Sequence, residues 1–111
     1  MEPQNLHQRY QSTLTQKEMI YDLLGAAAAD IRRAQTLMNG DRMGYEAVHR
    51  SLMHAQSIFH ELRGILPPED ESRLLFDALI AALADANVAG NAEPLGEALN
   101  ITERLRIVYR A

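Results

Sequence analysis

Residues 48–66 decide the fold of this chain, and they read VHRSLMHAQSIFHELRGIL. Apolar side chains recur alternately four and three residues apart, at Val48, Leu52, Ala55, Phe59, Leu62 and Leu66. On an α-helix this spacing produces one continuous apolar stripe, which is typical of a helix that packs against its neighbours. We therefore predict a helix here, with Leu52, Phe59 and Leu62 in the protein core.

Three further apolar residues of this helix, Ala47, Ile58 and Ile65, lie outside the stripe. At about 100° per residue they are a quarter of a turn or more away from it, so the apolar surface is wider than one stripe. Either this helix is central and buried on two sides, or its second face is free to bind a partner. The pattern alone leaves both interpretations open.

Composition limits the classes of protein that the chain can represent. Its 111 residues, 47% of them hydrophobic, suffice for one folded domain, and the low aromatic content of 5% favours helices over strands. A net charge of −4, with Lys17 as the only lysine, argues against a nucleic-acid binder. The absence of cysteine excludes disulfides and thiolate metal sites. No apolar run approaches the roughly 20 residues that cross a bilayer, and no signal peptide is recognisable, so we expect a soluble, cytoplasmic protein without membrane insertion.

Start and stop signals divide the chain into helices. Thr15 and Glu18 form a capping box at the start of a helix that runs to about Met38. Gly40 suits a left-handed helix end, and Asp41 suits the cap of the second helix.

The prolines at 67 and 68 end the second helix at Leu66, because proline lacks an N–H and restricts the residue before it. Acidic residues 69–71 suit the start of a third helix, which ends near 87–90, and Asn91 can cap a fourth. In the third helix we take the core stripe to be Leu75, Leu79, Ala82 and Ala86, flanked by Phe76, Ile80 and Leu83.

Short links make successive helices antiparallel. We therefore predict an all-α protein: an antiparallel up-down four-helix bundle over residues 15–111, preceded by an N-terminal arm over residues 1–14. Gly25, inside the first helix, costs roughly 1 kcal/mol in helix propensity relative to alanine, so we expect a close contact at that position.

Two patterns could suggest a metal site. Glu46-x-x-His49 has the spacing found in di-iron bundles, but such sites need a second pair, and the chain has none. His49, Met53, Gln56 and His60 share one helical face, which we interpret as a polar outer face and not as a copper site, because it lies away from the apolar stripe and no other helix supplies a partner set. There is no glycine-rich phosphate loop and no recognisable catalytic triad. We expect no metal, no cofactor and no enzymatic activity.

Several short motifs, in the same order and spacing, resemble the flagellar secretion chaperone family FliS. The strongest is Ala55-Gln56-x-Ile58-x-x-Glu61-Leu62, and weaker ones are residues 15–20, the pair Ala86-Asn87, and Leu105-Arg106 followed by Tyr109. The family's Leu-Tyr-Asp-Gly segment falls on Leu23-Leu24-Gly25-Ala26, so its tyrosine and aspartate are missing here. The resemblance extends over nearly the whole of residues 10–109.

The resemblance implies a chaperone that binds the disordered C-terminal segment of flagellin and prevents premature polymerisation, with the flagellar export apparatus as a further partner. It also implies that the N-terminal arm covers a binding groove in the free protein. On this interpretation the partner-binding residues are Leu6, Tyr10, Leu14, Leu24, Ile58 and Ile65. The alternative is a structural or regulatory bundle whose apolar surface makes a homodimer.

Overall fold

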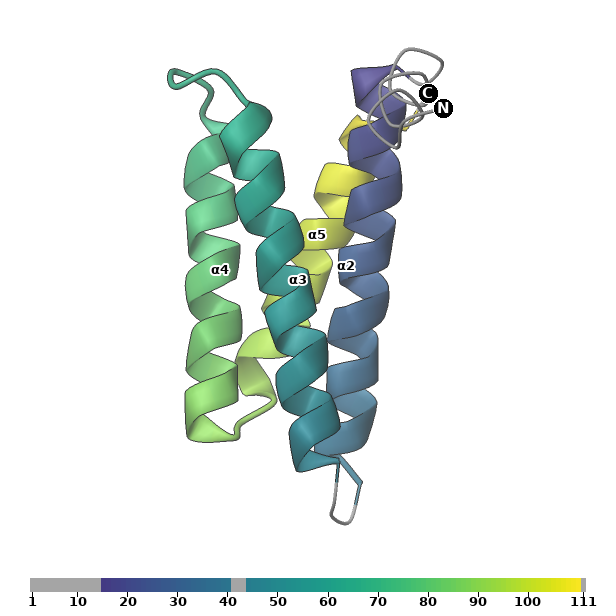
Figure 1. Ribbon diagram of the computed structural model, residues 1–111, viewed down its shortest axis with the longest axis vertical. Helices are drawn as coiled ribbons and strands as arrows, with labels where there is room; N and C mark the ends of the chain where they lie inside the picture. Colours follow the sequence, from purple (N-terminus) through teal and green to yellow (C-terminus); the bar gives the residue numbers. More distant parts are fainter. Residues whose placement is uncertain (1–14, 41–43, 111) are drawn as a thin grey trace, which may run out of the picture.

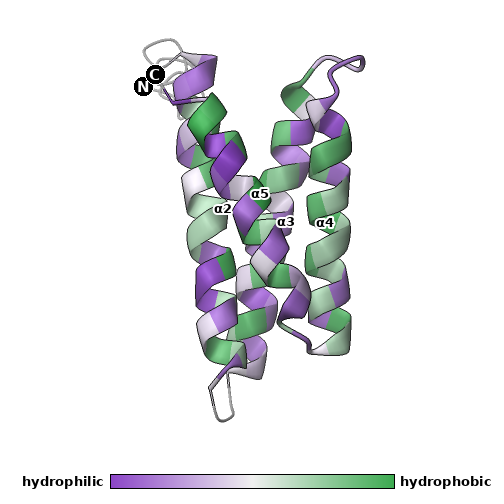
Figure 2. Cartoon of the chain, turned by 180° about the vertical axis from the view of Figure 1, so that it is seen from behind, coloured by the Kyte–Doolittle hydropathy of each residue, from purple (hydrophilic) through white to green (hydrophobic). Residues whose placement is uncertain are grey.

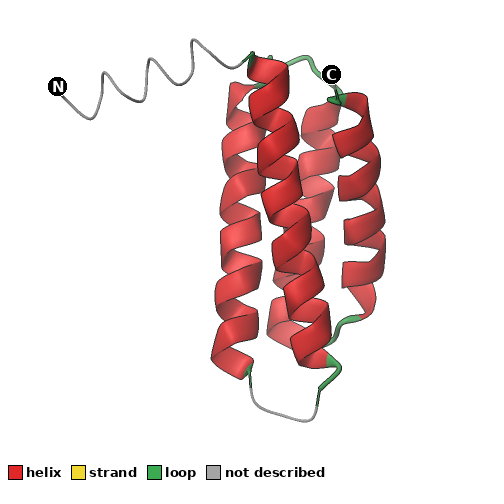
Figure 3. Cartoon of the chain, turned by 90° about the vertical axis from the view of Figure 1, so that its right-hand side faces the viewer, coloured by secondary structure: helices red, strands yellow, loops and turns green. Residues whose placement is uncertain are grey.

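The computed structural model describes residues 15–40 and 44–110, which form four α-helices. These helices are α2 (Gln16–Met38), α3 (Tyr45–Ile65), α4 (Ser72–Ala89) and α5 (Glu93–Val108). Each packs against the next one along the chain, and α5 returns to pack against α2 (Figure 1). The connections lie at alternate ends of the helices (Figure 3), so the predicted antiparallel up-down bundle is confirmed. The predicted arm lies outside the described residues.

The core runs along the centre of the bundle and receives side chains from all four helices. Phe59 of α3 and Phe76 of α4 meet there with ring centroids 6.1 Å apart. Leu52, Phe59 and Leu62 are fully buried, as predicted. Each large apolar side chain buried in this way contributes about 1.5–3 kcal/mol. The other large aliphatic residues that are fully buried are Leu24, Ile31, Leu79, Leu83 and Leu95.

The predicted capping box begins α2. The Thr15 hydroxyl accepts a hydrogen bond from the Glu18 backbone N–H (3.0 Å), and the Thr15 backbone N–H donates to the Glu18 carboxylate (3.1 Å). That backbone hydrogen bond, followed by the one from the Thr15 hydroxyl, lowers the pKa of Glu18. Because the folded pKa is the lower one, the resulting stabilisation is present above the unfolded pKa and is lost as the pH falls through the folded pKa.

The turn between α2 and α3 differs from the prediction. Gly44, with φ of 54°, is the N-cap of α3, whereas the predicted cap residue Asp41 lies outside the described residues. The left-handed conformation also falls on Gly44 and not on Gly40, because α2 ends in right-handed geometry at Asn39 (φ −84°). A Cβ atom at Gly44 would lie 3.1 Å from Cδ2 of Leu37, so space as well as conformation favours glycine there.

The connection from α3 to α4 is closed by one arginine. Leu66 is extended (ψ 148°), as a residue before proline must be, and α3 therefore ends at Ile65. Nη1 of Arg73 donates to the carbonyl oxygens of Arg63 (3.1 Å) and Leu66 (3.0 Å), and the Arg63 carbonyl also accepts from the Leu66 backbone N–H (3.3 Å). The first turn of α4 is thereby tied to the last turn of α3.

Helix α5 crosses the bundle obliquely (Figures 1 and 2). Its N-terminal half lies beside α4, whereas its C-terminal half lies beside α2, where Glu103 pairs with Arg32 and Arg106 contacts Tyr21. The N-terminal half of α4 and the C-terminal half of α5 consequently diverge.

The predicted core stripe of α4 is wrong in part because of this divergence. The buried residues are Phe76, Leu79, Leu83 and Ala86. Leu75, on the side of α4 that would face α5, remains 41% exposed.

Gly25 makes the close contact that the sequence suggested. A Cβ atom at this position would lie 2.8 Å from Nη2 of Arg106. The Arg106 side chain crosses this part of α2, stacks 4.2 Å from the centroid of the Tyr21 ring, and donates through Nε to the Tyr21 carbonyl oxygen (3.4 Å). Gly25 weakens the helix but leaves the space in which the Arg106 side chain connects α5 to α2.

Replacing Thr15 by alanine should lower the free energy of unfolding by about 1 kcal/mol, because the first turn of α2 loses its side-chain acceptor. Urea denaturation followed by circular dichroism measures this change. The matched control is Thr36→Ala in the exposed part of the same helix, where we expect no loss because alanine has the higher helix propensity. Equal losses in the two variants would contradict a role for the cap.

The effect of Gly25→Ala should depend on Arg106. In an Arg106→Ala background the added methyl group should stabilise the protein by about 0.5–1 kcal/mol, which is the helix-propensity gain. In the wild-type background the gain should be smaller, because the methyl group displaces the guanidinium group. A double-mutant cycle of unfolding free energies measures the coupling, and a value of zero would show that the two sites are independent.

Candidate partner-binding surface

The structure separates the residues that the sequence grouped as partner-binding. Leu24 is fully buried, and Ile58 is only 6% exposed. Ile65, in the last turn of α3, remains 37% exposed. Leu6, Tyr10 and Leu14 lie outside the described residues.

The expectation that Ile58 lies on a free second face of α3 is therefore wrong. Helix α3 packs against both α2 and α4, so both parts of its wide apolar surface are used inside the bundle. The side of α3 that faces solvent is largely polar, and its exposed residues include Glu46, Arg50, Ser57 and Glu61.

Helix α4 carries an exposed apolar stripe. Leu74 is 71% exposed and Val88 is 90% exposed, and the residues between them on the same side of the helix include the exposed alanines Ala78 and Ala81. We call the exposed stripe formed by Leu74, Ala78, Ala81, Asp85 and Val88 the α4 face. Figure 2 shows hydrophobic colouring along much of α4. Exposed Leu75 widens the α4 face on the side from which α5 has diverged.

The spacing within the sequence could have revealed this face. Residues 74, 78, 81, 85 and 88 are separated alternately by four and three, as are the buried residues 76, 79, 83 and 86 in the reverse order. Two such stripes on opposite sides of one helix indicate more apolar surface than one core contact needs. Ile58 and Ile65 instead suggested an excess on α3.

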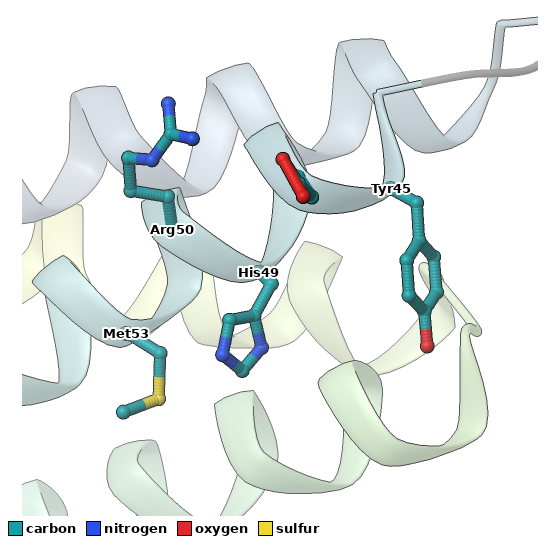
Figure 4. Close-up of a pocket in the computed structure, with 5 residues that line it drawn as sticks. Tyr45, His49, Arg50 and Met53 are labelled. Carbon is teal, nitrogen blue, oxygen red and sulfur yellow. The ribbon is translucent and has the colours of Figure 1, made fainter.

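A depression of about 680 Å³ opens on α3 near its N-terminus, lined by Tyr45, Glu46, His49, Arg50 and Met53. In Figure 4 the side chains of Tyr45, His49 and Met53 point toward α4, and Arg50 points away. Tyr45 and Met53 are exposed, so the depression adds apolar surface.

This depression adjoins the C-terminal end of the α4 face. Nδ1 of His49 hydrogen-bonds to the side-chain amide of Asn87 (2.9 Å), which is the chain neighbour of Val88. This hydrogen bond joins the lining of the depression to the helix that carries the α4 face.

The residues that suggested metal chemistry do not assemble a ligand set. Glu46 and His49 are exposed on the outside of α3, and within residues 15–40 and 44–110 no three histidine or acidic side chains come together to hold an ion. His49 is engaged with Asn87, and His54 pairs with Asp30 of α2 (2.5 Å). Of the helices in the described part of the chain, none has the length and hydrophobicity to cross a membrane.

A small helical bundle that exposes an apolar helix face belongs, by its architecture, with proteins that act by binding other proteins. The comparison with known families gives the particular family: the family model described as Flagellar protein FliS matches residues 3–111, nearly the entire chain. The chain belongs to this family of flagellar export chaperones. No curated protein shows significant similarity to it.

The different burial of the two isoleucines predicts different effects on stability. Ile58→Ala should lower the free energy of unfolding by about 2–5 kcal/mol, because it leaves a cavity between α3 and its neighbours. Ile65→Ala, at the exposed end of the same helix, should change it by no more than about 0.5 kcal/mol. Urea denaturation of both variants measures the difference. A stable Ile58→Ala variant would show that this side chain is not part of the core.

Proposed function

We propose that the protein is a cytoplasmic chaperone for flagellin, which binds the disordered C-terminal segment of flagellin and prevents its polymerisation before export. Membership of the FliS family supports a flagellar client. The structural observation that carries the proposal is the exposed α4 face, because a soluble bundle has no need of leucine and valine on a solvent-facing side for its own stability.

The physical properties of the surface suit such a client. An amphipathic segment that is disordered when free can place its apolar side on the α4 face as a short helix. Ordering the segment costs conformational entropy, so useful affinity needs a long contact. The α4 face extends from Leu74 to Val88, and the depression lined in part by Tyr45, His49 and Met53 lies on the neighbouring helix α3.

The proposed binding region revises the set of residues inferred from the sequence. Ile65 is exposed and is available for contact. Leu24 and Ile58 enter the proposal only as core residues that hold the helices in place. The role of Leu6, Tyr10 and Leu14 as a displaceable cover remains a prediction. We propose a binding role without catalysis, and delivery of the client to the flagellar export apparatus.

Homodimerisation through the same surface is the alternative, and the charges on α4 disfavour its simplest form. An antiparallel contact between two copies, centred on Ala81, would bring Asp85 of one copy to Asp77 of the other. Like charges placed opposite one another across a contact are destabilising. The α4 face is therefore better suited to a different chain.

Introducing a charge at the centre of the α4 face should weaken client binding. We expect Ala81→Glu to raise the Kd for the C-terminal flagellin segment by at least about tenfold. The contact would remove water from the new Glu carboxylate without supplying a hydrogen-bond or ion-pair partner for it. Fluorescence anisotropy with a labelled segment measures the Kd. The matched control is Ala29→Glu, at an exposed alanine on α2, which should leave the Kd unchanged.

Circular dichroism should show equal helicity for the two variants, since both positions are exposed. Sedimentation of the free protein tests the alternative: a dimer that Ala81→Glu dissociates would favour homodimerisation. Equal affinities of wild type and Ala81→Glu for the segment would remove the α4 face from the proposed function.

A further inference from the structure

Asp85 is the single charged residue within the α4 face. Its side chain is exposed and has no ion pair or hydrogen bond with any residue in the described part of the chain. The positions three and four residues away along the helix are Ala81, Ala82, Val88 and Ala89, so the helix offers no side chain that could pair with it. A lone carboxylate therefore stands in an otherwise apolar stripe.

Three other charged side chains of α4 and the turn before it, Asp70, Arg73 and Asp77, have partners within the protein. Asp77 pairs with Nε of Arg63 (2.5 Å), and Asp70 accepts from the Ser72 backbone N–H (2.8 Å). Arg73, the only basic residue of α4, donates to carbonyl oxygens at the end of α3. A chain that docks on the α4 face consequently meets Asp85 and no cation from α4.

Exposed acidic residues add to this charge at one end of the face. Glu69 and Glu71 precede the first turn of α4 and are both exposed. The electrostatic potential over the α4 face should therefore be negative, and it favours a partner that brings positive charge.

The size and spacing of the residues fit a helical partner. The alternating four- and three-residue spacing from Leu74 to Val88 is that of a coiled-coil seam, along which a second helix can pack nearly parallel or antiparallel. Ala78 and Ala81 in the middle are small and allow close approach. In such seams a single polar position sets the register of the two helices, at some cost in affinity.

We propose that the α4 face accepts an amphipathic helix with a lysine or arginine within its apolar seam, and that Asp85 pairs with this cation and determines the register of the bound helix. The inference rests on the proposed function. It names Asp85 as the residue that determines specificity in the proposed binding site. Docking removes water from the Asp85 carboxylate, which costs free energy. A partner without the cation therefore binds more weakly, whereas in a partner with the cation an ion pair to Asp85 offsets that cost. A second copy of α4 cannot supply the cation from its own face.

Two synthetic peptides test this assignment. Both are amphipathic helices of about 18 residues with leucine at the seam positions, and they differ only in one central seam residue, which is lysine in one and glutamate in the other. Wild-type protein should bind the lysine peptide at least about tenfold more tightly than the glutamate peptide. Asp85→Lys should reverse the preference, and Asp85→Asn should reduce it to less than about threefold.

The matched control is Asp22→Lys, which makes the same change of charge at an exposed position on α2. It should keep the wild-type preference, whereas a general effect of net charge would alter it as much as Asp85→Lys does. An unchanged preference in Asp85→Lys would overturn the inference, and so would equal binding of the two peptides by the wild-type protein.

Binding of the flagellin segment, measured beside the peptide preference, distinguishes a failure of this inference from a failure of the proposed binding site. If Ala81→Glu weakens binding of the segment while Asp85→Lys leaves the peptide preference unchanged, the α4 face binds the client and Asp85 does not determine its register. If Ala81→Glu has no effect on the segment, the α4 face is not the client site; the inference about Asp85 then fails, and the proposed function loses this face as its binding site.

Discussion

The burial of α3 against two neighbours at once is the contact on which the rest of the structure depends. Its apolar surface is wider than one helix contact requires, and α2 and α4 each cover part of it. Ile58 is enclosed within the bundle, and Phe59 meets Phe76 at the centre of the core. Because α2 and α4 cover this surface except at Tyr45, Met53 and Ile65, a long exposed apolar stripe must come from another helix.

The oblique course of α5 determines which helix that is. Arg106 passes over Gly25 and stacks on Tyr21, which holds the C-terminal half of α5 against α2. The N-terminal half of α4 therefore lacks α5 as a neighbour, and Leu74 and Leu75 remain exposed. One glycine on α2 and one arginine on α5 thus influence the accessible surface of α4, which neither residue needs to touch.

An exposed apolar face is useful to a chaperone and hazardous to the protein that carries it. The α4 face combines small alanines with a single carboxylate, a combination that makes self-association less favourable than an uninterrupted row of leucines would. The same carboxylate gives the surface a means to discriminate between helices of similar hydrophobicity. Affinity from apolar contact and selectivity from charge can thus reside on one helix face.

The sequence by itself determined the four helices, their antiparallel order and most of the core. These features follow from local signals: the capping box at Thr15 and Glu18, the prolines after Leu66, and the alternating spacing in residues 48–66. Such signals act within one or two helical turns, so they can be read without knowledge of the neighbouring helices.

Only the tertiary structure decided which apolar stripe is buried and which is exposed. Both α3 and α4 carry more apolar surface than one contact needs, and the sequence favoured α3 as the binding helix. The crossing of α5 leaves Leu75, on the side of α4 toward α5, 41% exposed, whereas Leu74 and Val88 lie on the side of α4 opposite its buried residues. The number and angle of neighbouring helices are properties of the assembled bundle, because they depend on contacts such as Arg106 with Tyr21, which lie 85 residues apart in the chain.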